Sequence, residues 1–235
     1  MFKFRSTILA IAALCILTPA HASGARAVKL FSDDFTKDSV LNTQWTLSEL
    51  NPASNYRLTG DGLLLEASGE NGGSDLWVGT GYRASLLLRP IPPDADWTIY
   101  THFTFAPEID FQAAGIILTT QTNNFDRTSK FHRFELSWQN RQNGLGVASY
   151  TNGPIDPPFA PYSGAEIFLK LEKSGSQYRY LYRTATSEWK LVSVFVDTNR
   201  YLYAGLDSLR QPRHGNATLD SKPVFKSFAL LPPMR

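Results

Sequence analysis

The chain has 235 residues, with 23 Lys and Arg, 21 Asp and Glu, and one cysteine. Lys3 and Arg5 lie in the first 22 residues, which hold no acid, so the rest of the chain carries 21 basic and 21 acidic residues. This balance, without any run of Lys or Arg, argues against nucleic acid and anionic membranes as partners. It is compatible with an uncharged ligand.

The N-terminus has the features of a secretory signal peptide. A basic start precedes an apolar run over residues 8–17, and Ala20-His21-Ala22 is a small-x-small cleavage site. The apolar run is too short to span a bilayer, which argues against a transmembrane anchor as the alternative. A lipoprotein signal at Cys15 is a second alternative, but Leu14 is too large for the residue that precedes such a cysteine.

We expect residues 1–22 to be removed and residues 23–235 to form one exported domain, periplasmic or extracellular, with no membrane insertion after cleavage. Cys15 is lost with the signal, so the mature chain has no disulfide and no thiol chemistry. It must be stabilised by its hydrophobic core, and roughly 210 residues are enough for a single all-β domain.

The mature chain has the pattern of β-structure throughout. Short runs rich in aromatic and β-branched residues are separated by Gly, Pro, Asn and Asp, and no segment keeps a 3.6-residue period. About a dozen such runs predict two packed sheets. The predicted strands are Val28–Phe31, Gly62–Ala67, Ala84–Leu88, Trp97–Phe105, Ala113–Thr120, Phe131–Trp138, Leu145–Tyr150, Ile167–Glu172, Gln177–Arg183, Lys190–Phe195, Leu202–Leu206 and Val224–Leu230.

The order of short motifs is similar to that of a known family. Asp33-Asp34-Phe35, Gly62–Ala67, Leu87–Pro90 and Phe111–Leu118 follow one another, and Glu188-Trp189 comes later. This pattern resembles the concanavalin A-like jelly-roll domain at the C-terminus of bacterial β-xylosidases and arabinofuranosidases. The resemblance implies a β-sandwich of two curved antiparallel sheets, whose concave groove binds saccharide or packs against a catalytic domain. No catalytic domain is present in this chain, so the role of such a domain does not transfer directly.

A pair of carboxylates raises the question of catalysis. Concanavalin A-like glucanases carry Glu-x-Asp-x-Glu, or a bulged form, on one strand of the concave face, and Glu108 and Asp110 match its first two positions. The third position is Gln112, or Ala113 with the bulge, and neither residue can transfer a proton. Because Pro107 indicates a loop, we expect Glu108 and Asp110 to be surface carboxylates without a catalytic role.

A second group of residues favours carbohydrate binding. Alternation in 131–138 places Arg133, Glu135 and Ser137 on one face, opposite Phe134, Leu136 and Trp138. Aromatic rings stack on sugars, and Arg and Glu hydrogen-bond hydroxyl groups. With a neighbouring strand and a Gly-rich rim included, the predicted ligand-binding residues are Trp77, Tyr82, Arg83, Tyr100, His102, Arg133 and Glu135. The alternative is an Arg133–Glu135 surface pair that contributes little.

Two further patterns have structural interpretations. Tyr178, Tyr180 and Tyr182 have a period of two, which favours core packing, with Trp189 across a hairpin, over a sugar platform. Asp33, Asp34 and Asp207 are candidate ligands for a structural Ca²⁺, although no calcium-loop spacing is present.

The sequence thus predicts an exported lectin-like protein that recognises a polysaccharide or oligosaccharide, with no further cofactor. Two alternatives stay open. One is a glycoside hydrolase or polysaccharide lyase that uses Glu108, Asp110 or Glu135 with a second acid. The other is a docking domain for a separate secreted glycosidase.

Overall fold

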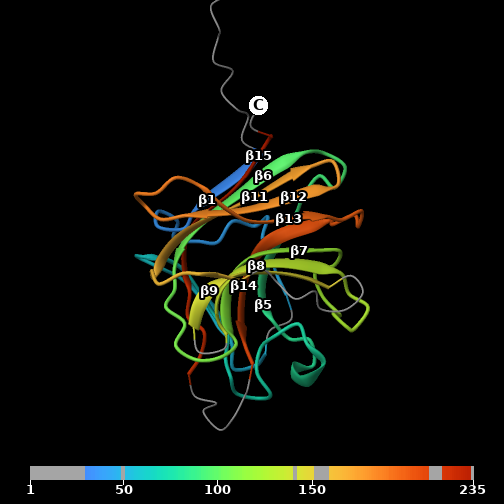
Figure 1. Ribbon diagram of the computed structural model, residues 1–235. Coiled ribbons are helices and arrows are strands. Elements are labelled where there is room, and N and C mark those ends of the chain that lie inside the picture. Colours follow the sequence, from blue (N-terminus) through green and yellow to red (C-terminus); the bar gives the residue numbers. More distant parts are fainter. Residues whose placement is uncertain (1–29, 49–50, 140–141, 151–158, 212–218, 234–235) are drawn as a thin grey trace, which may run out of the picture.

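The computed structural model describes residues 30–48, 51–139, 142–150, 159–211 and 219–233 (Figure 1). The predicted signal peptide and its cleavage site lie outside these residues. In the described part, strands β1 to β15 form two antiparallel sheets that pack face to face, which confirms the predicted all-β sandwich. The one helical element there is a 3-10 turn, η1 (Val78–Thr80), and no helix has the length and hydropathy to cross a membrane.

Sheet A forms one layer of the sandwich. Its strands, in order across the sheet, are β13 (Lys190–Val196), β12 (Gln177–Arg183), β11 (Glu166–Ser174), β6 (Trp97–Thr104), β15 (Val224–Leu231), β4 (Gly62–Glu66) and β3 (Asn55–Thr59), and β1 (Phe31–Asp34) also pairs with β15.

Sheet B forms the other layer. Its order is β10 (Phe159–Pro161), β9 (Gln142–Tyr150), β8 (Phe131–Gln139), β7 (Gln112–Thr119), β14 (Tyr203–Arg210), β5 (Ser85–Pro90) and β2 (Thr46–Leu47). Three short strands, β2, β3 and β10, were not predicted, because none has a long apolar run. The predicted strand Val28–Phe31 begins outside the described residues, and β1 starts only at Phe31.

The main core lies between the sheets and follows the alternation of the strands. Trp97, Ile99 and Phe103 of β6 point into it, as their period of two predicts. Tyr178 and Tyr180 of β12 are buried there too, which confirms the core interpretation of the tyrosine stripe. The expected Trp189 contact is wrong, because Trp189 packs against Tyr100 on the outer face of sheet A.

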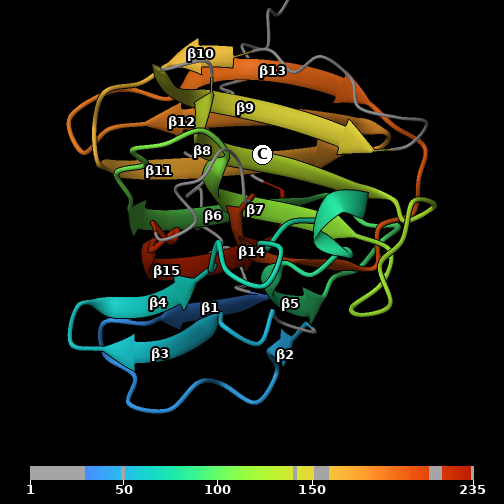
Figure 2. The same ribbon diagram turned by 90° about the horizontal axis from the view of Figure 1, so that it is seen from below.

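A second, smaller apolar cluster lies on the outer face of sheet B. Leu76 packs there with Ala84 and with side chains from all four central strands: Leu86, Leu88, Ala113, Ile117, Phe131 and Leu209. Leu76 belongs to residues 68–84, which we call the covering segment. Figure 2 shows the coil of η1, in this segment, in front of sheet B and to the right of the β7 label. Part of the face that was expected to be an open groove is therefore covered by the chain itself.

Candidate ligand-binding site

The covering segment is fastened to sheet B by a buried ion pair. Arg133 projects from β8 because it alternates with the core residues Phe134 and Leu136. Its Nη1 donates to Oδ1 of Asp75, in the covering segment, at 2.6 Å. Both side chains are buried, so water does not weaken their attraction as it does at the surface.

Two more carboxyl groups lie beside this pair. Glu135 of β8 and Asp207 of β14 both face Gly115 of β7, the strand between them. Gly115 has no side chain to separate them, and a β-carbon there would come within 2.0 Å of the Phe134 carbonyl oxygen. Glu135 Oε2 lies 3.7 Å from Arg133 Nε. One guanidinium thus has three carboxyl groups as neighbours.

Because these carboxyl groups are buried and outnumber the one guanidinium, the pKa values of two of them are raised. Burial is the main cause that raises the pKa of Glu135, and the Arg133 charge opposes it. Burial and the adjacent Glu135 raise the pKa of Asp207 well above its ordinary value. Within the described residues, neither oxygen of Asp207 has a hydrogen-bond partner of ordinary geometry. The two groups therefore titrate as a pair, which favours retention of one proton between them.

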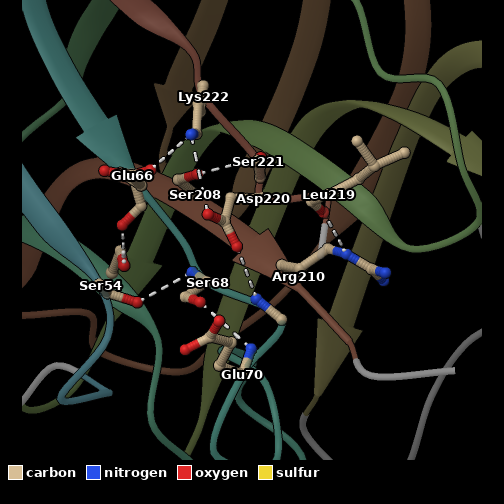
Figure 3. Close-up of polar contacts among 12 residues, drawn as sticks. Ser54, Glu66, Ser68, Glu70, Ser208, Arg210, Leu219, Asp220, Ser221 and Lys222 are labelled. Carbon is tan, nitrogen blue, oxygen red and sulfur yellow. Dashed lines mark hydrogen bonds and ion pairs between the residues drawn. The ribbon is translucent and has the colours of Figure 1, made fainter. Parts of the chain in front are cut away.

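The base of the covering segment is fastened by a second set of polar contacts, drawn in Figure 3. The Gly69 N–H donates to Asp220 Oδ1 at 3.1 Å, and the Ser68 N–H donates to Ser54 Oγ at 3.0 Å. Lys222 bridges Glu66 and Asp220 at 2.9 and 3.7 Å. These contacts fix the position where the segment leaves β4.

The tip of the covering segment is open to solvent. Trp77 is 46% exposed and follows the buried Leu76 directly. Its ring lies against Gly79, where a β-carbon would come within 1.9 Å of the ring. The carbonyl oxygen of Trp77 accepts N–H groups of Thr80 and Tyr82, both at 3.1 Å. These contacts present an aromatic ring on a rigid turn, as sugar stacking requires.

Tyr82 and Arg83 lie beside Trp77 at this tip. Tyr82 has a φ of 57° and is half-buried, while Arg83 is exposed and its backbone pairs with that of Asp75. The predicted rim residues Trp77, Tyr82 and Arg83 therefore belong to one turn. We call this turn the Trp77 tip.

The structure separates the other predicted binding residues. Arg133 and Glu135 lie buried beneath the covering segment, where Arg133 holds Asp75, and both are closed to a ligand. Tyr100 and His102 lie on β6, which pairs with β11 and β15 in sheet A, whereas β8 belongs to sheet B. The expectation that β6 neighbours β8 is wrong, because alternation identifies a face of a strand but leaves its sheet undetermined.

The first two acids of the glucanase-like motif lie on the loop before β7. Glu108 and Asp110 are exposed there, as expected. Gln112, the third position, is buried, and its Oε1 accepts the N–H groups of Glu108 and Ile109 at 2.7 and 3.3 Å. Gln112 therefore shapes this loop. Glu108 lines an open depression with Asp220 and Lys222, and the latter two are engaged by the base of the covering segment.

The three candidate calcium ligands do not come together. Asp33 and Asp34 lie on β1 in sheet A, whereas Asp207 lies in sheet B. Asp33 accepts the Trp45 indole N–H at 2.7 Å, and burial raises its pKa to about 6. Asp34 pairs with Lys37 at the surface. Among the described residues, no three His, Cys, Asp or Glu side chains form a metal-ligand group.

Sequence reasoning missed the residues that link distant segments. Asp75 has no motif around it, and its pairing with Arg133 joins positions 58 residues apart. Asp207 was considered only as a metal ligand. An acid directly after a predicted apolar strand, as Asp207 is after Leu202–Leu206, is the one signal that could have indicated a buried carboxyl pair.

These features define a concanavalin A-like β-sandwich of the kind found in glycosidases. The family model of the β-xylosidase C-terminal concanavalin A-like domain matches residues 32–205, so the chain belongs to this family. Comparison with curated protein sequences gives no match.

Solved structures with the same fold differ in the rest of their architecture. The GH43 protein BlXynB of Bacillus licheniformis aligns with a TM-score of 0.66 and 14% identity, over 86% of this chain and 39% of that one. This chain therefore spans about two fifths of that relative. LamAcat of Zobellia galactanivorans aligns with a TM-score of 0.58 and 12% identity, over 86% and 97% of the two chains. The CBM2 module of the evolved Dit protein of Lactobacillus casei BL23 phage J-1 gives 0.56 and 12%, over 88% and 97%. At these identities the likeness shows the fold alone.

Proposed function

We propose that the protein is an exported carbohydrate-binding protein and that the Trp77 tip is its binding surface. The observation that carries this proposal is an exposed indole on a segment held by a buried ion pair. The apolar face of a sugar ring stacks on an indole, and Tyr82 and Arg83 supply neighbouring hydroxyl and guanidinium donors for sugar hydroxyls. A fixed turn loses little conformational entropy when it binds. Membership in a glycosidase-associated family supports a saccharide as the ligand.

Calorimetric titration with xylan, arabinan and β-glucan oligosaccharides tests the proposal. We expect at least one to bind, and Trp77→Ala to weaken that binding about tenfold or more, as loss of a central aromatic anchor does. Tyr56→Ala is the matched control, because Tyr56 is also an exposed aromatic residue but lies on β3 of sheet A. The proposal is wrong if no saccharide binds at millimolar concentration, or if the two variants lose affinity equally.

A hydrolase is the second candidate, and the Glu135–Asp207 pair is what favours it. Two neighbouring carboxyl groups that retain one proton between them would supply the acid and the carboxylate that glycosidases use. Both groups are buried under the covering segment, so a substrate would reach them only after that segment moves. Release of reducing sugar that Glu135→Gln and Asp207→Asn both abolish would favour catalysis over binding. A docking role on a separate glycosidase stays a prediction, testable by co-purification.

A further inference from the structure

The outer face of sheet A carries a row of side chains with a different chemistry. His102, Phe168 and Arg183 are paired directly across β6, β11 and β12. The His102 ring stacks on Phe168 with centroids 4.0 Å apart and an interplanar angle of 9°. The Arg183 guanidinium lies 4.6 Å from the Phe168 centroid. Phe168 is thus held between an imidazole and a guanidinium.

Trp189 completes this group from the β12–β13 hairpin. Its ring centroid lies 5.2 Å from the Arg183 guanidinium and 5.8 Å from the Tyr100 ring. Tyr100, Phe168, Arg183 and Trp189 are all half-buried, so parts of each are open to solvent. The face therefore presents a cation set among aromatic rings.

The charges around Arg183 are already paired with one another. Lys170 and Arg179 both bind Glu172, at 2.8 and 2.9 Å, and His102 binds Glu166 at 2.8 Å. Arg183 takes part in none of the ion pairs of the described residues, and its Nε is buried without a hydrogen-bond partner. A planar guanidinium without a carboxylate partner is suited to bidentate recognition of one.

We propose that this face is a second ligand site, specific for a saccharide that bears a carboxylate. The guanidinium of Arg183 binds the carboxylate of a uronate residue through its terminal nitrogens, and the open edges of Trp189 and Tyr100 contact the sugar ring. Two features of this face fit such a ligand. Arg183, which pairs with no carboxylate of the described residues, attracts an anion, and the aromatic rings beside it suit the C–H face of a sugar. The site is distinct from the Trp77 tip, because the two lie on opposite sheets of the sandwich.

Titration of the full chain with a galacturonate oligosaccharide and its neutral methyl ester tests this second site. We expect the acid to bind at least tenfold more tightly than the ester, and its affinity to fall as NaCl rises from about 0.05 to about 0.5 M. Equal affinity for acid and ester would overturn the proposal without any variant. A sulfated oligosaccharide that binds as tightly as the uronate would overturn its carboxylate specificity.

Variants locate the binding site on the protein. Arg183→Gln should lower affinity for the uronate at least tenfold, and Arg183→Lys should retain part of it because the positive charge stays. Arg179→Gln is the matched control, since Arg179 lies on the same strand and already pairs with Glu172. Trp77→Ala should leave uronate binding unchanged, so failure of the proposed function at the Trp77 tip and failure of this site are distinguishable. Equal losses in Arg183→Gln and Arg179→Gln would contradict the assignment.

Discussion

The charged side chains on the outer faces of the two sheets differ in their exposure to solvent. On sheet A, Glu172 pairs with Lys170 and Arg179, and Arg179 is about half exposed to solvent. On sheet B, Arg133 is buried with three carboxyl groups beneath the covering segment. Sheet A therefore has a charge that reaches solvent, Arg179, beside a buried Lys170, while the charges beneath the covering segment are all buried and depend on one another.

This contrast indicates where each face contributes stability and where it can contribute binding. Exposed ion pairs are worth little, so Arg179, whose side chain is 47% exposed, can be rearranged around a ligand at small cost. A buried cluster is sensitive to each of its members, because removal of one partner leaves charges that water cannot reach. The buried cluster on sheet B therefore supports the Trp77 tip, and sheet A presents Arg183, a cation that pairs with no carboxylate of the described residues.

The largest effect should come from removal of the buried cation. Arg133→Met leaves Asp75, Glu135 and Asp207 together without a positive charge. We expect the free energy of unfolding to fall by about 3–5 kcal/mol, as for other broken buried pairs. Urea denaturation followed by fluorescence measures it. Arg179→Met on sheet A is the control and should cost less than about 1 kcal/mol. Similar losses in the two variants would remove the distinction between the faces.

The second test concerns the close approach of strands under the carboxyl pair. In Gly115→Ala the new β-carbon would lie 2.0 Å from the Phe134 carbonyl oxygen and 2.8 Å from the Glu135 Cα, so β7 and β8 must separate. We expect a loss of about 1–3 kcal/mol, typical of overpacking. Gly146→Ala on β9 is the control, since nothing lies within 4 Å of its added carbon. A Gly115→Ala protein as stable as Gly146→Ala would show that this strand spacing is loose.

The third test is the pH dependence of the buried cluster on sheet B. Asp207 has a raised pKa in the folded state, so the folded protein keeps a proton that the unfolded chain releases above about pH 4. Its contribution to stability is present below that pH and is lost as pH rises through the folded pKa. Asp207→Asn removes this loss and leaves Glu135 free to pair with Arg133.

We therefore expect Asp207→Asn to gain stability relative to the parent as pH increases, by on the order of 1–3 kcal/mol between about pH 5 and 9. Unfolding midpoints across this range measure the difference. Asp33, with a pKa of about 6, changes the stability of both proteins with pH in the same way, so its contribution cancels from the difference. A difference that is constant with pH would mean that Asp207 does not titrate in this window.

Much of the fold was predictable, because burial in a sandwich produces a period of two along each strand. Trp97, Ile99 and Phe103 show it, and the loop position of Glu108 and Asp110 followed from Pro107. Which strands pair with one another could not be predicted from this alternation. Tyr100 and Arg133 have similar alternation, yet their sheets differ, since the order of strands depends on contacts between segments far apart in sequence. The Asp75–Arg133 pair was missed for the same reason.

The smallest expected effect on stability is at the Trp77 tip. This test distinguishes the role of the tip in binding from the role of the buried cluster beneath it in stability. Because Trp77 is 46% exposed, Trp77→Ala should change the free energy of unfolding by no more than about 0.5 kcal/mol. It should still weaken binding of the neutral saccharide about tenfold or more, whereas Arg133→Met should weaken that binding only through the loosened segment. Denaturation and titration of the same two proteins compare these effects. If Trp77→Ala destabilises the fold as much as Arg133→Met, the indole is a structural part of the covering segment and the tip is not a separate binding surface.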